Sequence, residues 1–110
     1  MYCRDVAAAI DYALSRGRLV LFVSQPHLPP SVARDQHIEQ QKTIAAMLER
    51  RYPRRHDVMY VNLGDDLDLR DDTLAFDGMH LTTAGNGRVA RWLVRPVLDL
   101  ARDSAQAVAR

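Results

Sequence analysis

The stretch LVLFV at residues 19–23 decides the fold of this chain. A short unbroken run of apolar residues is typical of a strand that is covered on both faces, as in a parallel sheet. The following segment, residues 24–30, holds three prolines and is therefore predicted to be a loop. Before the run, apolar residues recur at helical spacing between Asp5 and Ser15, and Gly17 is placed to end that helix.

A second helix and a second strand follow the loop. Residues 34–52 carry an apolar stripe at helical spacing, and Pro53 ends the pattern. Residues 58–63, VMYVNL, then read as a strand. Strand, long helical crossover and strand make a βαβ unit, so we expect the two strands to be parallel. The fold class predicted from this order is α/β.

The remainder of the chain predicts one more helix and no second domain. This helix is expected to begin at Thr82 or Thr83, either of which can cap it, and to be kinked or split at Pro96. We expect residues 1–102 to belong to a single domain and residues 103–110 to form a frayed tail. Two strands make a poor central sheet because both are edges, so the sequence also indicates that further strands are missing.

Composition excludes several classes of function. The chain has 110 residues, 47 % hydrophobic and 26 % charged, with a net charge of +1. This balance gives no overall basic field, so we expect neither a nucleic-acid partner nor attraction to an anionic membrane; a helix-turn-helix at residues 81–93 is disfavoured for the same reason. No apolar run is long enough to span a bilayer, and the first residues show no signal-peptide pattern. The single cysteine, Cys3, excludes an intramolecular disulfide and a cysteine-based zinc cluster.

The candidate site residues are Asp77 and His80. They lie three residues apart, with Gly78 between them, on a loop that leads into the last helix. Such a carboxylate can accept a hydrogen bond from imidazole Nδ1–H, which leaves Nε2 to take a proton from a nucleophile. On spacing alone, a purely local pair that decorates the start of a helix is the favoured explanation of the pattern.

The wider block resembles one protein family. Residues 77–86, DGMHLTTAGN, with Val89-Ala90 and Pro96-Val97-Leu98 after them, are similar to the last conserved block of the SGNH/GDSL hydrolases. The resemblance implies a flavodoxin-like three-layer α/β/α sandwich with a parallel sheet, whose N-terminal part is missing here. It implies hydrolysis of a small carboxylic ester through an acyl-serine, with Asp77 orienting His80 and His80 as general base and then acid. No metal and no organic cofactor is implied.

The departure from that family is equally clear. The sequence has no Gly-Asp-Ser block, which supplies the family's nucleophile, and neither of the blocks that complete its oxyanion hole. We therefore expect a C-terminal part of an SGNH hydrolase-like domain that is inactive alone. Ser24 follows the first strand but lacks the strained turn that exposes a catalytic serine, so we expect it to bond its own loop. The alternative is a non-catalytic interaction domain derived from a degenerate hydrolase, with its sheet edge as the contact.

The other polar clusters predict no metal site. His27, His37 and His56 show no metal-ligand spacing and are expected to be solvated. The aspartates of residues 65–72 do not follow the EF-hand order, so we expect a solvated acidic turn. The sequence carries no signal for an oligomeric state or for a cellular location.

Overall fold

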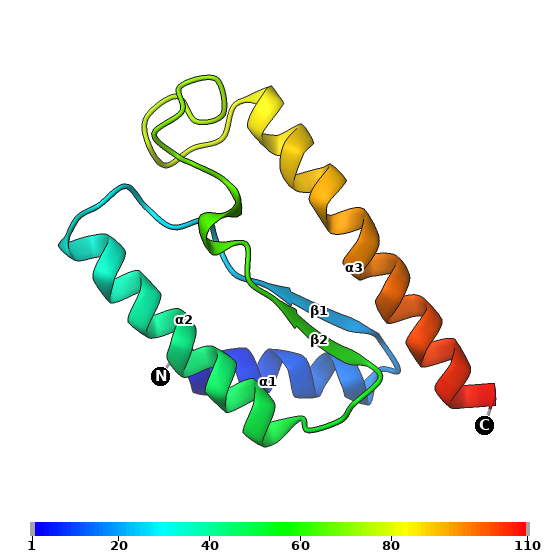
Figure 1. Ribbon diagram of the computed structural model, residues 1–110. Helices are drawn as coiled ribbons and strands as arrows, with labels where there is room; N and C mark the ends of the chain where they lie inside the picture. The colour runs from blue at the N-terminus through cyan, green and yellow to red at the C-terminus, as the bar shows by residue number, and fades with distance from the viewer. Residues whose placement is uncertain (1, 110) are drawn as a thin grey trace.

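The computed structural model describes residues 2–109, apart from the side chains at positions 65, 108 and 109. It is a mixed α/β structure with two parallel strands and three helices (Figure 1). The elements in chain order are α1 (Tyr2–Ser15), β1 (Val20–Val23), α2 (Val32–Arg51), β2 (Val58–Val61), the short 3₁₀ turn η1 (Gly64–Asp66) and α3 (Thr83–Ala109).

The predicted parallel pairing is confirmed. β1 and β2 pair in register, with Val20 opposite Val58 and Val23 opposite Val61. Within residues 2–109 the sheet has these two strands alone, so each keeps one unpaired edge. The strands are not covered as fully as their apolar sequence predicts, because every one of their residues is only half-buried.

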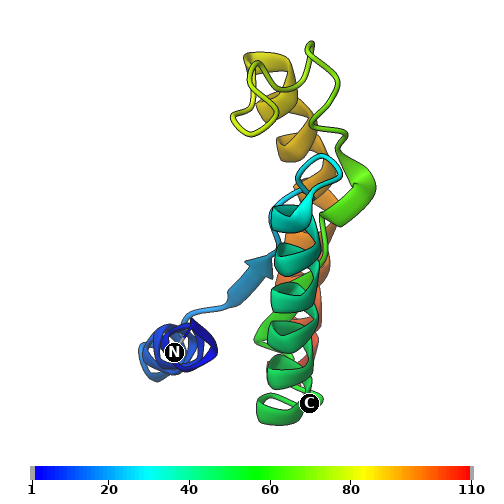
Figure 2. The same cartoon turned by 90° about the vertical axis from the view of Figure 1, so that its left-hand side faces the viewer.

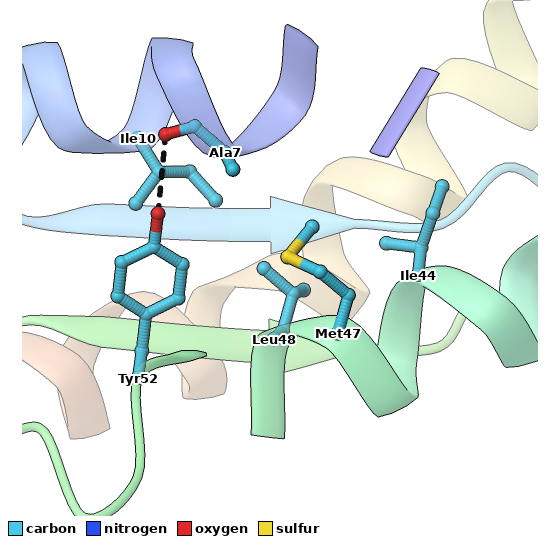
Figure 3. Close-up of a cluster of buried hydrophobic side chains, with 6 residues drawn as sticks. All are labelled: Ala7, Ile10, Ile44, Met47, Leu48 and Tyr52. Atoms are coloured by element: carbon cyan, nitrogen blue, oxygen red, sulfur yellow. Dashed lines mark hydrogen bonds between the residues drawn. The ribbon is translucent and has the colours of Figure 1, made fainter. Parts of the chain in front are cut away.

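The main core lies between α1, α2 and one face of the sheet (Figure 3). Alternate strand residues face this core, as the period of a strand requires; they are Val20, Phe22, Val58 and Tyr60. Tyr52, just after α2, donates its hydroxyl hydrogen to the Ala7 carbonyl oxygen (3.1 Å) and lies close to Asp11 Oδ1 (2.7 Å) on α1. Figure 2 shows α1 end-on beside an upright α2, so the two helices cross steeply and this tyrosine ties them together.

Helix α3 contacts both strands and is longer and less interrupted than predicted. The expected split at Pro96 is wrong, since one helix runs from Thr83 to Ala109 with Pro96 inside it. The helix continues beyond Arg102 into the segment that was expected to fray. Asp99 forms an ion pair with Arg95 (3.1 Å), which spans the proline, and one with Arg102 (2.7 Å) in the next turn. Both pairs have a spacing that supports a helix. Val97 is half exposed on this helix, together with Val94 and Leu98 on neighbouring positions.

A second, smaller core lies beyond the carboxyl ends of the strands. Its buried members are Leu67, Leu69, Leu74 and Ala75, and its half-buried ones are Leu28, Leu81 and Val89. The acidic turn predicted at residues 65–72 does expose Asp66, Asp68, Asp71 and Asp72, but the two leucines between them are buried. This small core fastens the loops after both strands to the start of α3.

None of the helices described is both long and apolar enough to cross a membrane.

Gly85 is the tightest point of this arrangement. A Cβ at Gly85 would overlap the carbonyl oxygen of Leu74, whereas a Cβ at Gly87, two residues further along α3, would meet only the end of the flexible Arg91 side chain. We predict that Gly85→Ala lowers the free energy of unfolding by about 2–3 kcal/mol through overpacking. Gly87→Ala is the matched control and should raise it by about 0.5–1 kcal/mol through helix propensity.

Urea unfolding midpoints measure both variants at an unchanged denaturant slope. Equal stabilisation by the two alanines would show that α3 does not touch Leu74.

Candidate functional site

Residues 74–82 form a tight turn that is closed by backbone bonds. Ala75 and Leu81 form an antiparallel bridge, the Phe76 amide donates to the His80 carbonyl oxygen (3.1 Å), and the Thr82 amide donates to that of Leu74 (2.8 Å). Thr82 then caps α3, accepting the Gly85 amide on its side-chain oxygen (3.1 Å). The predicted helix cap at this threonine is confirmed. The turn is also anchored to the second core, because Leu74, Ala75 and Leu81 pack there.

Gly78 lies in the turn with φ +77°, in the left-handed region that glycine tolerates best. A Cβ there would stand 3.7 Å from Pro29 Cγ, so the turn lies against the proline loop after β1. Gly78 therefore allows the tight turn between Asp77 and His80. The loops after the two strands therefore meet beside the Asp77–His80 pair.

The structure brings Asp77 and His80 into direct contact. Asp77 Oδ1 accepts the amides of Met79 (2.9 Å) and His80 (2.6 Å), and Asp77 Oδ2 lies 2.5 Å from His80 Nδ1. The hydrogen bond from the His80 amide, and next the one with the His80 imidazole, lower the pKa of Asp77 to about 2. Asp77 is thus ionised at neutral pH, with one oxygen bonded to backbone amides and the other in contact with the imidazole.

The imidazole of His80 is oriented but open. Its Nδ1 is taken by Asp77, and no hydrogen bond to Nε2 is found within residues 2–109. The His80 side chain is 65 % exposed, and the ring of Phe76 stacks on one of its faces. No serine or threonine hydroxyl described here bonds to His80. The arrangement supplies a base and its orienting acid without a nucleophile.

Ser24 has a structural place instead. It is buried, donates its hydroxyl hydrogen to Asn62 Oδ1 (2.7 Å) and accepts the Leu63 amide (2.9 Å). Our expectation that it bonds its own loop is wrong, because both partners follow β2. A further bond, from the His27 amide to the Gly64 carbonyl oxygen (2.8 Å), joins the same two loops. Ser24 therefore aligns the carboxyl ends of the strands.

A cleft of about 360 Å³ lies between those loops and the start of α2. Its lining residues are His27, Leu28, Pro30, Arg34, Leu67, Asp68 and Arg70. Neither Asp77 nor His80 lines it, although Pro29, which lies between two of its lining residues, is next to the turn.

The expected solvation of His27 and His37 is wrong, since both are half-buried and their rings meet edge to face with centroids 5.9 Å apart. His56 is exposed as predicted.

Two aspartates of the acidic segment make local turns. Asp68 Oδ1 accepts the Arg70 amide (2.9 Å), and Asp71 Oδ1 accepts the amide and hydroxyl of Thr73 (2.9 and 2.6 Å). The Arg70 guanidinium and then the Arg70 amide lower the pKa of Asp68, and the Thr73 hydroxyl and then the Thr73 amide lower the pKa of Asp71. Among the residues whose side chains are described, no three histidine, cysteine or acidic residues gather closely enough to hold a metal ion.

Comparisons with protein-family models, with curated proteins and with solved structures gave no match to this chain.

The bonds of Asp77 predict its titration. Because folding depresses its pKa below the unfolded value of about 3.9, the bonds stabilise the fold above that pH and are lost as the pH falls towards 2. We expect the Asp77 carboxyl carbon to titrate near 2 in an NMR series, well below the unfolded value of about 3.9.

His80→Ala separates the two causes of that low pKa. The variant removes the imidazole but keeps the backbone amide of residue 80, which is the larger cause. The Asp77 midpoint should therefore rise only part of the way to its ordinary value. A complete return would show that the imidazole, and not the amide, holds the carboxylate.

Ser24→Ala tests the link between the two loops. The variant leaves Asn62 Oδ1 and the Leu63 amide without their buried partner, so the free energy of unfolding should fall by about 1–3 kcal/mol. Ser104→Ala on α3 is the control and should be neutral or slightly stabilising. Urea unfolding measures both, and an unchanged midpoint in Ser24→Ala would contradict the structural role.

Proposed function

We propose that this chain is the Asp–His part of an SGNH/GDSL-type serine esterase that hydrolyses small carboxylic esters. The observation that carries the proposal is the contact of Asp77 Oδ2 with His80 Nδ1, which leaves Nε2 open to a nucleophile. The resemblance of residues 77–86 to the last block of that family supports it. On this proposal, the nucleophilic serine and most of the oxyanion hole come from polypeptide outside this sequence.

The proposed chemistry follows from the two side chains. His80 Nε2 takes the proton of the serine hydroxyl as its oxygen attacks the ester carbonyl, and the imidazolium returns that proton to the departing alcohol. Water repeats the sequence on the acyl-serine. Asp77 keeps the Nδ1–H tautomer and stabilises the imidazolium, and its low pKa keeps it ionised throughout. Neither a metal nor an organic cofactor takes part.

The proposed parent fold is a three-layer sandwich. Val20, Phe22, Val58 and Tyr60 face the core with α1 and α2, so the alternate strand residues face the other way. Helix α3 contacts both strands and would form the layer on that second face. Further parallel strands would pair with the two open edges of this sheet, as a central sheet of the family requires.

The alternative is an interaction domain without catalysis. The unpaired edges of β1 and β2 and the exposed Val94, Val97 and Leu98 on α3 favour it. A stable, stoichiometric complex on native purification, with no esterase activity in either component, would support this alternative over the esterase.

The first prediction of the esterase proposal concerns the chain by itself. With no serine bonded to His80, an unactivated alkyl ester such as ethyl butyrate should be hydrolysed no faster by the wild type than by His80→Ala. Turnover that disappears in His80→Ala would contradict the missing nucleophile and would point to a hydroxyl or water within this sequence.

A second measurement addresses the parent protein. The intact mass and N-terminal sequence of the protein from its own source should show a product heavier than 12.5 kDa, with a Gly-Asp-Ser block upstream. In that protein, His80→Ala should lower kcat by about 10⁴-fold or more, with a smaller loss in Asp77→Asn. A native product of 12.5 kDa without a serine-bearing partner would overturn the esterase proposal.

A further inference from the structure

Phe76 is an exposed aromatic residue whose ring lies on the candidate base. Its side chain is 69 % exposed and belongs to neither hydrophobic core. Its ring centroid is 5.9 Å from that of His80, and the two planes differ by 20°. The Phe76 amide also donates to the His80 carbonyl oxygen (3.1 Å), which fixes the two residues side by side across the turn.

The two contacts of the imidazole restrain different motions. The bond from Nδ1 to Asp77 Oδ2 holds one edge of the ring but touches neither of its faces. The Phe76 ring stacks on one face and so limits tilting of the imidazole out of its plane.

We propose that Phe76 is the positioning residue for His80, holding the imidazole so that Nε2 points to the open side of the turn. The inference rests on the proposed function of His80 as general base. It adds a third residue to the pair, one that acts through His80 and does not itself handle a proton.

The chain offers a matched control for this role. Met79 lies in the same turn and is comparably exposed, at 59 %, but its side chain has no ring to stack on His80. If both side chains served only to contact a partner protein, substituting either one would have the same effect on His80. If Phe76 positions His80, only the substitution of Phe76 will change the imidazole.

The experiment is NMR of the full chain with labelled histidines, at about pH 8 where an ordinary imidazole is neutral. The His80 signals are assigned by their absence in His80→Ala. In the wild type we expect upfield-shifted ring protons from the Phe76 ring and a ¹⁵N pattern with the proton on Nδ1. Phe76→Leu should remove the ring shift and reduce the ratio of the Nδ1–H form to the other tautomer by about two- to fivefold.

Rescue and control variants complete the test. Phe76→Tyr should restore the tautomer ratio, and Met79→Leu should leave it unchanged. The amide signals of Ala75 and Leu81 report whether the turn stays closed in each variant. An unchanged tautomer ratio in Phe76→Leu, or an equal loss in Met79→Leu, would overturn the inference.

These outcomes are independent of ester hydrolysis because no substrate is present. A tautomer shift in Phe76→Leu without esterase activity in the parent protein would sustain the positioning role and reject the proposed function. Esterase activity that depends on His80, with no tautomer shift in Phe76→Leu, would sustain the proposed function and reject the positioning role.

Discussion

The backbone carbonyl of Leu74 is the point on which the Asp77–His80 turn depends. It accepts the Thr82 amide at 2.8 Å, and Gly85 on the first turn of α3 packs directly against it. The Leu74 side chain is buried in the second core at the same point. The turn therefore stays closed as long as α3 keeps its first turn, and the geometry of the acid–base pair is set by packing beneath it as well as by the loop.

The parts of this structure that the sequence predicts are those with local signals. Apolar runs located β1 and β2, and a spacing of three residues located Asp77 beside His80. The roles of Ser24 and Leu67 were missed for two different reasons. The partners of Ser24 lie 38 and 39 residues away, which no local pattern reveals. Leu67 and Leu69 alternate with charged residues in an aspartate-rich segment, and their period of two was outweighed by composition. At Pro96 the expected split did not occur: the helix continues through the proline, and the Arg95–Asp99 ion pair spans it.

The pair has the geometry for proton transfer but not the environment. His80 is 65 % exposed and Asp77 is 42 % exposed, so water weakens the field between them. Stabilisation of a developing oxyanion needs donors fixed in a site from which water is excluded. Within residues 2–109 no hydrogen bond to Nε2 is found, and most of the His80 side chain is open to water. On the proposed function, the polypeptide that brings the serine must also cover this site.

The unpaired edges of the sheet and the exposed Asp77–His80 turn could both be covered by one additional parallel strand and the loop that follows it. The two strands expose one edge each, and apolar edges of this kind are usually paired or covered in stable proteins. Because the strands are parallel, the loops that follow both of them lie at one end of the molecule, the end that carries the Asp77–His80 turn (Figure 1). A further parallel strand on either edge would deliver its own carboxyl-terminal loop to that same end, where ligands bind in open α/β sheets. On the proposed function, pairing the sheet and completing the site would then be one event.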